Sequence, residues 1–123
     1  MTTGNLKNSN LIINLNASIH EAMEKITDNQ RGAVVVVDER YYLQGVVSDG
    51  DIRRAMLRGA TMVTPVAKIV NTNAVTLTKK QVLAKRPDQI FQQESSINIL
   101  PVIDNHNKVI EVVIRNPEKR RGV

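Results

Sequence analysis

Apolar residues in the first quarter of the chain recur with the spacing of an amphipathic helix. Ser18 precedes this run, and Glu21 lies three residues after Ser18. This is the arrangement of a capping box, in which the serine oxygen accepts an amide and the glutamate reaches back. The pattern predicts a helix that runs to about Asn29 and is stopped by Gly32. Its apolar face, at positions i, i+3, i+4 and i+7, consists of Ile19, Ala22, Met23 and Ile26.

Two β-branched segments follow this helix. Residues 33–38 (AVVVVD) form a continuous apolar run, which predicts a strand buried on both faces. After a turn at residues 38–40, residues 43–48 (LQGVVS) predict a second strand, and residues 51–59 (DIRRAMLRG) predict a second helix. The first half of the chain therefore has the order helix, strand, strand, helix.

The second half of the chain begins this order again. Thr64 and Pro65 have the pattern of an N-cap followed by proline at the first helical position, so PVAKIV predicts a short connecting helix. The segment AVTL is predicted to be extended. Residues 79–94 are predicted to be partly helical, with Pro87 beginning a new helix or kinking the old one. NILPVID and KVIEVVI then predict two more strands.

The two halves match each other at a constant offset along the chain. Residues 36–38 match residues 102–104, and Leu43 matches Val109. A repeat of this size is too small to bury both faces of its own sheet, so the two repeats should pack together about a pseudo-two-fold axis in a mixed α/β (α+β) fold. The predicted segments are a polar N-terminal segment, a first repeat, a degenerate second repeat and a basic tail, at 1–11, 12–63, 64–116 and 117–123.

Composition narrows the class of protein. The chain of 123 residues has the size of one domain, and it contains no cysteine. This excludes a disulfide framework, a thiolate metal site and a cysteine nucleophile. The N-terminal MTTGNLKNSN lacks the apolar core of a secretory signal, and no apolar run approaches the roughly 18 to 20 residues that span a bilayer. We therefore expect a soluble, cytoplasmic protein that does not bind membranes.

The formal net charge of +5 would indicate a polyanionic partner if the basic residues clustered. They fall instead into three separate groups, and the chain has only two tyrosines and one phenylalanine on which bases could stack. We therefore do not expect nucleic-acid binding. The three groups are residues 53–58, 79–86 and 119–121.

The sequence carries no motif of a catalytic or metal site. His20 and His106 lack the HxxxH and HExxH spacings of metal ligands, and we expect both on the surface. Ser18 and Ser48 lack a nucleophile elbow. We therefore predict no catalytic residue, no metal ligand, no required cofactor and no enzymatic activity for this chain.

The segment GVVSDGDIRRA, residues 45–55, has two interpretations. Ser48 and Asp51 fit a second capping box, which would make the segment only a strand running into a capped helix. The junction also leaves unsatisfied amides and the positive end of the helix dipole at the strand end, where anions bind. Gly50 in the first helical turn suggests a close approach to the backbone. Three arginines oppose the helix dipole, a strain that a bound phosphate would relieve: Arg53, Arg54 and Arg58.

The chemistry of the segment favours a nucleotide over a metal ion. Asp51 can accept two hydrogen bonds from the vicinal hydroxyls of a ribose, and Ser48 can donate to a phosphate or ribose oxygen. Asp49 and Asp51 are too few carboxylates for a cation cage. We therefore favour a ligand site over a helix cap alone.

These residues carry a resemblance to a known family. The tandem β-α-β-β-α pattern with GAVVVVDERYYLQGVVSDGDIRRAMLRG resembles a CBS domain pair, or Bateman module, over Ile12 to Ile114. The resemblance implies an adenosine-type nucleotide (AMP, ADP or ATP) at the motif formed by Gly45, Ser48 and Asp51. The resemblance also implies that the backbone near Gly32 and Ala33 contacts the base. The other candidate nucleotide-binding residues are Ser48, Asp51, Gly50, Asp49, Arg53 and Arg54.

The segment DGDIRRAMLRG is similar to a segment of the CBS pairs that are fused to some sugar-phosphate nucleotidyltransferases. The resemblance therefore implies a regulatory module that controls an attached or partner enzyme of that kind. It also implies a homodimer, head-to-head or head-to-tail. The alternative is a structural dimerisation module that binds no ligand, with the Ser48–Asp51 motif serving only as a cap.

The second repeat departs from the motif of the first. At the same offset along the chain, Glu111 replaces glycine, Ile114 replaces serine and Pro117 replaces aspartate. The valines of the strand are kept, but the hydroxyl and the carboxylate are lost. We therefore predict one ligand cleft rather than two.

Overall fold

The structure, a computed structural model, describes residues 9–115. The chain forms two three-stranded sheets with helices and one short 3₁₀ helix. In chain order the elements are β1 (Ile12–Asn14), α1 (Ile19–Asn29), β2 (Ala33–Val37), β3 (Leu43–Ser48), α2 (Asp49–Leu57), η1 (Val66–Lys68), β4 (Leu77–Thr78), α3 (Lys79–Leu83), α4 (Arg86–Gln93), β5 (Ile99–Ile103) and β6 (Val109–Ile114).

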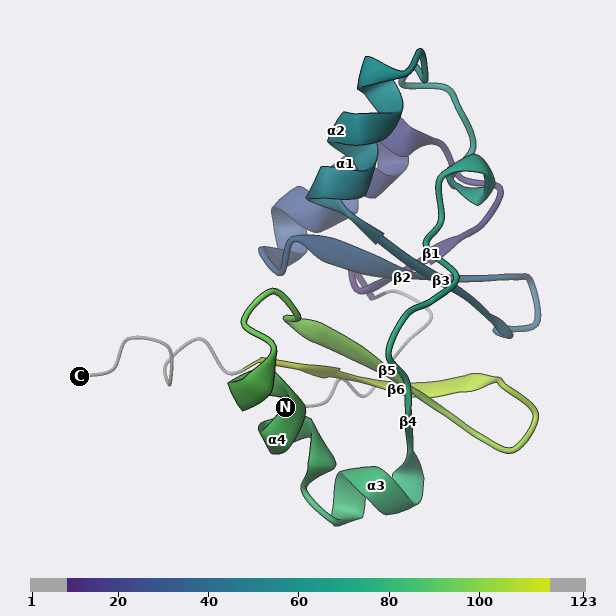
Figure 1. The fold of residues 1–123 in the computed structure, drawn as a ribbon. Coiled ribbons are helices and arrows are strands. Elements are labelled where there is room, and N and C mark those ends of the chain that lie inside the picture. The colour runs from purple at the N-terminus through teal and green to yellow at the C-terminus, as the bar shows by residue number, and fades with distance from the viewer. Residues whose placement is uncertain (1–8, 116–123) are drawn as a thin grey trace.

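The elements stack in four layers, helices outside and the two sheets face to face (Figure 1). One sheet has the strand order β1-β2-β3 and the other β4-β5-β6. In each sheet the first pairing is parallel and the second antiparallel. Helices α1 and α2 cover the outer face of the first sheet, and α3 and α4 cover the outer face of the second (Figure 1). The predicted mixed α+β fold of two packed repeats is confirmed.

The central strand of the first sheet is buried on both faces, as its valine run predicts. Val34 and Val36 pack into the core under α1 and α2. Val35 and Val37 point the other way, into a core between the two sheets that also contains Val112. A third core lies under α4. Because β2 belongs to two cores, every residue of it is apolar.

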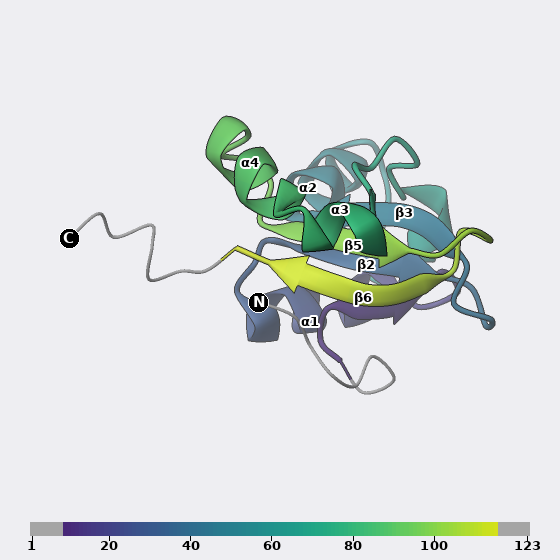
Figure 2. The ribbon, with the colours of Figure 1, turned by 90° about the horizontal axis from the view of Figure 1, so that it is seen from below.

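The two repeats are related by a pseudo-two-fold axis. The pairing register shifts at Val36/Val37 in one sheet and at Val102/Ile103 in the other, which are equivalent positions of the two repeats. The tips of the two β-hairpins lie side by side in both views (Figures 1 and 2).

The contacts between these tips are reciprocal. The Leu43 amide donates to the Asn107 carbonyl at 2.9 Å, and the Val109 amide donates to the Tyr41 carbonyl at 2.8 Å. In the second hairpin, the amides of Lys108 and His106 donate to Asp104 Oδ1. These hydrogen bonds hold the pKa of the Asp104 carboxyl below its usual value.

Three local predictions need correction. Helix α1 ends at Asn29, as predicted, but its C-cap is Gln30, in the left-handed conformation at φ 57°, rather than Gly32. Of the two bonds predicted for its capping box, the structure has the one from the Glu21 amide to the Ser18 oxygen. Pro65 rather than Thr64 is the N-cap of η1, because the Thr64 hydroxyl accepts the Thr61 amide of the preceding turn instead.

The connection between the repeats runs along the edge of β3. Val46 and Asn71 exchange backbone hydrogen bonds at 2.9 and 3.1 Å, so the connection adds to the first sheet before it enters β4. Gly45 permits this crossing, because a Cβ at this position would lie 2.3 Å from the Asn71 carbonyl oxygen. Its φ of +150° also disfavours other residues.

Within the described residues 9–115, none of the helices has the length and apolar character needed to cross a membrane.

Candidate functional site

The junction of β3 and α2 forms the capping box that its sequence predicts. The Asp51 amide donates to Ser48 Oγ at 3.1 Å, and the Ser48 amide donates to Asp51 Oδ2 at 2.9 Å. Two of the amides at the start of α2 are therefore satisfied within the chain. The predicted capping box is confirmed.

Ser48 and Asp51 also line a cavity of about 410 Å³ between the two repeats. This volume suits a nucleotide-sized ligand. Five of the eight candidate residues meet there: Gly32, Ala33, Ser48, Asp51 and Arg54. The rest of the lining comes from the loop before β2, strand β3, the connection and the second repeat: Arg31, Val46, Asn71, Asn73, Ala74, Val75, Ser96, Ile97, Asn98 and Ile99.

The Asp51 carboxylate keeps acceptor capacity toward the cavity. Oδ2 accepts the Ser48 amide, and Oδ1 accepts a hydrogen bond from the Arg54 guanidinium at 2.9 Å. Each carboxylate oxygen has two lone pairs, so each can accept one further donor. The Asp51 side chain is 21% exposed, which leaves it accessible from the cavity. It could therefore receive both hydroxyls of a vicinal diol.

Gly50 has a neighbour within the chain. A Cβ at this position would lie 3.1 Å from the nearer guanidinium nitrogen of Arg54. The absence of a side chain thus lets Arg54 fold back over the first turn of α2 and reach Asp51. The close approach inferred from Gly50 is made by this arginine, and Gly50 itself is not among the residues that line the cavity.

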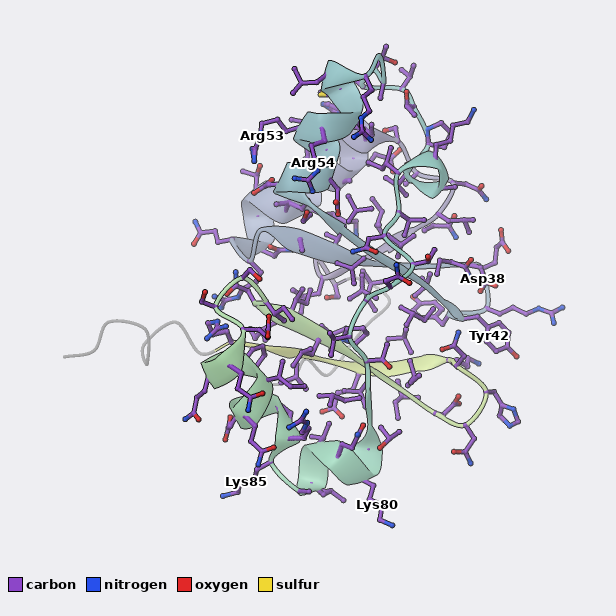
Figure 3. All side chains as sticks on the ribbon, viewed as in Figure 1. Asp38, Tyr42, Arg53, Arg54, Lys80 and Lys85 are labelled. Atoms are coloured by element: carbon purple, nitrogen blue, oxygen red, sulfur yellow. The ribbon has the colours of Figure 1, made fainter. Side chains whose placement is uncertain are left out.

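Asp49 and Arg53 lie around a different hollow of α2. Both line a small groove with Met23, Met56 and Leu57, and neither is among the residues that line the cavity. Figure 3 shows Arg53 and Arg54 leaving α2 in different directions. Asp49 lies beside the cavity lining, because its amide donates to the Gly32 carbonyl at 2.9 Å, whereas Arg53 lines only the groove. Contact of either residue with a ligand stays a prediction.

The cavity wall contributed by the second repeat was not predicted. Ser96, Ile97 and Asn98 precede β5 and occupy the place that residues 30–32 have before β2. The Asn98 side-chain amide donates to the Arg31 carbonyl at 3.3 Å, which joins the two loops across the repeats. Ligand contacts from this wall depend on how the sheets pack, and no single motif encodes them.

Arg115 fixes the position of this wall. Its Nε donates to Asn98 Oδ1 at 2.9 Å, and its other nitrogens donate to the carbonyls of Phe91, Glu94 and Ile97 at 2.6 to 2.8 Å. The guanidinium also lies 5.0 Å from the centre of the Phe91 ring. One side chain therefore ties the end of α4, the wall of the cavity and the end of β6 together.

The second repeat lacks the polar set of the first, as predicted. Glu111 takes the place of Gly45 and forms an ion pair with Lys79 at 3.1 Å, with its side chain 13% exposed. Ile114 takes the place of Ser48. Pro117, the counterpart of Asp51, lies outside the described residues.

The histidines take no part in a cluster. His20 is exposed and lies 3.8 Å from Glu24 on the same helix, and His106 is exposed in the second hairpin. Within residues 9–115, no group of three or more histidine, aspartate or glutamate side chains could hold a metal ion.

The sequence and the fold of this chain are similar to those of known proteins. Residues 4–58 match the family model described as CBS domain. The chain is 30% identical over 95 residues to the arabinose 5-phosphate isomerase GutQ of Salmonella typhi, covering 77% of this chain and 29% of GutQ. The chain thus spans less than a third of the length of this curated relative.

Two solved structures share the fold. The CBS domain pair of protein MJ0100, in complex with 5′-methylthioadenosine and S-adenosyl-L-methionine, has a TM-score of 0.67 at 20% identity, over 92% of this chain and 91% of its own. The cytosolic domain of the Mg²⁺ channel MgtE, in complex with ATP, has a TM-score of 0.59 at 20% identity, over 85% of this chain and 41% of its own.

The first repeat therefore matches the CBS domain family, and the chain as a whole has the fold of a CBS domain pair. The resemblance inferred from the sequence is confirmed at this level. The narrower resemblance to sugar-phosphate nucleotidyltransferases has no support in GutQ, which is an isomerase.

Proposed function

We propose that this CBS pair binds an adenosine-type nucleotide in the cavity between its repeats and thereby controls an attached or partner enzyme. The observation that carries the proposal is the position of Ser48 and Asp51 at the edge of a cavity of about 410 Å³. Both offer a ribose the groups that recognise a diol. If the nucleotide binds one packing of the two repeats more tightly than another, binding shifts the populations of these packings. This shift would change the activity of the enzyme.

The other walls of the cavity suit the rest of a nucleotide. Ala33, Val46 and Ile99 supply apolar surface for a base. The Arg31 side chain is half-buried and has no hydrogen-bond or ion-pair partner within residues 9–115. A phosphate would satisfy it. MJ0100 and MgtE, whose CBS folds are similar, were solved with adenosine-containing ligands.

The enzyme under control is proposed to act on a sugar phosphate. This inference rests on GutQ, an arabinose 5-phosphate isomerase of which this chain matches 29%. A nucleotidyltransferase stays a prediction without support from GutQ. The module is taken to comprise the repeats 12–63 and 64–116, and a cytoplasmic location also stays a prediction.

Thermal melting with a panel of ligands tests the proposal. AMP, ADP or ATP at about 100 times its dissociation constant should stabilise the fold by roughly 2.7 kcal/mol. A panel of sugar phosphates without a base serves as the control and should leave the melting temperature unchanged. A transition that no adenine nucleotide moves would favour the alternative, a dimerisation module without a ligand.

We also propose that the module is a homodimer. Leu57, the last residue of α2, is 83% exposed, and Val63, in the loop between α2 and η1, is 81% exposed. Exposed apolar side chains of this size suggest a covered surface. Sedimentation velocity should give twice the monomer mass for the unmodified chain, and Leu57→Glu combined with Val63→Glu should give the monomer. A monomer before substitution would contradict the proposal.

A further inference from the structure

A second, basic groove opens next to the cavity between the repeats. It has a volume of about 540 Å³ and lies between α2 and the segment around η1. Asp51 and Arg54 line both hollows, so the two meet at these side chains. Arg58 and Lys68 line only the groove. A ligand that reaches Arg54 from the cavity is therefore at the entrance of the groove.

The groove carries an excess of positive charge. Arg54 lies on α2 and Arg58 is the C-cap of that helix, while Lys68 belongs to η1 on the other side of the groove. Asp51 is the one acidic residue of the lining, and its Oδ1 is already bonded to Arg54. Neither Arg58 nor Lys68 has an ion-pair or hydrogen-bond partner for its side chain within residues 9–115.

The cavity and the groove differ in chemistry, as the nucleoside and the phosphates of a nucleotide do. The cavity between the repeats has apolar walls and the acceptor Asp51, which suit a base and a ribose. The groove has three cations drawn together from two elements, whose mutual repulsion an anion would relieve. Arginine and lysine are the side chains that bind phosphate most strongly.

We propose that this groove is a polyphosphate subsite, in which Arg58 and Lys68 hold the phosphates beyond the first. The inference rests on the proposed nucleotide function, with the nucleoside in the cavity and Arg54 at the junction. It names a ligand class: adenosine di- and triphosphates in preference to the monophosphate and to uncharged adenosine derivatives. A cationic derivative such as S-adenosylmethionine is disfavoured by the same charges.

Calorimetric titration of the full chain with adenosine, AMP and ATP tests the subsite. We expect ATP to bind roughly tenfold or more tightly than AMP, because each charge-assisted contact contributes about that factor. The variant Arg58→Gln with Lys68→Gln should remove most of this difference and leave the affinity for AMP within about twofold, since exposed charges act weakly at a distance. Raising the salt concentration should reduce the advantage of ATP over AMP.

A variant that removes two positive charges elsewhere provides the matched control. Lys80 and Lys85 are exposed in the second repeat, at the opposite end of the molecule from α2 (Figure 3). Lys80→Gln with Lys85→Gln changes the net charge equally and should leave the affinities for AMP and ATP unchanged. If this variant weakens ATP as much as the groove variant does, the preference reflects net charge and the subsite is wrong.

The remaining outcomes separate the two proposals. If AMP and ATP bind equally well, or if the groove variant weakens both by the same factor, the subsite is wrong and the nucleotide function stands. If neither adenosine nor its phosphates bind, the nucleotide function fails and the subsite fails with it.

Discussion

Replacing Asp51 with asparagine should weaken nucleotide binding by roughly 10- to 100-fold, because two hydrogen bonds from a ribose to a charged acceptor are replaced by weaker contacts with a neutral amide. The fold should tolerate the change. An asparagine oxygen can still accept the Ser48 amide, and the ion pair to Arg54 that is lost is largely exposed, with Arg54 61% accessible. Such a pair contributes about 1 kcal/mol or less. Calorimetric titration measures the affinity, and thermal melting without ligand measures the stability.

The chain contains a matched control for this substitution. Glu21 holds the third position of α1, as Asp51 does in α2, and its amide likewise bonds to the N-cap serine. Glu21 lies outside the cavity lining. Glu21→Gln removes the same charge from the same helical position and should leave nucleotide affinity unchanged. An Asp51→Asn variant that binds as tightly as the unmodified chain would show that Asp51 is only a cap.

Replacing Gly45 with alanine should produce the largest loss of stability, about 2 to 4 kcal/mol, through overpacking and backbone strain. A Cβ at this position would meet the Asn71 carbonyl oxygen at 2.3 Å and the Val70 side chain at 2.7 Å. The Asn71 carbonyl cannot move away without disturbing its hydrogen bond from the Val46 amide. Denaturant unfolding should show the loss as a lower midpoint with little change in slope.

Gly59→Ala separates strain from steric overlap. Gly59 also has a positive φ, +109°, but a Cβ there would have no atom within 4 Å. This variant should therefore lose only the strain, about 1 kcal/mol. If Gly45→Ala is no more destabilising than Gly59→Ala, the connection between the repeats does not pack against β3 as described.

The sequence predicts most of the helices and strands because they follow from hydrophobic periodicity. The valine run of β2 predicts burial on two sides, and the structure supplies the two cores that bury it. The constant offset between the repeats predicts a second hairpin, and the structure places its register shift at Val102/Ile103, equivalent to Val36/Val37 of the first. The residue that caps a helix is less predictable: the left-handed C-cap of α1 is Gln30, where glycine is the usual residue.

The candidate site could be predicted only on the side that one motif encodes. Ser48 and Asp51 are close in sequence, so their capping box and their chemistry can be inferred together. The opposite wall, Ser96 to Asn98, reaches the cavity because two sheets stack. Its position depends on Arg115, an arginine whose partners lie 17 to 24 residues away in the chain. No local pattern signals such a contact.

Gly45 belongs to the motif for a structural reason. The resemblance groups it with Ser48 and Asp51 at a nucleotide, but it is absent from the cavity lining, and its close neighbour is the connection at Asn71. In the second repeat Glu111 takes its place and points instead to Lys79. The glycine is therefore explained by packing against the connection, and the proposed ligand contacts rest on Ser48 and Asp51.

A crystal structure of the chain grown with ATP tests the central claim most directly. The account predicts density for the nucleoside between the repeats, with ribose oxygens within hydrogen-bonding distance of Asp51 and the base against Ala33 and Ile99. The phosphates should pass Arg54 toward Lys68. Density for the nucleotide elsewhere on the molecule, or a cavity that stays without it at saturating ATP, would contradict the account.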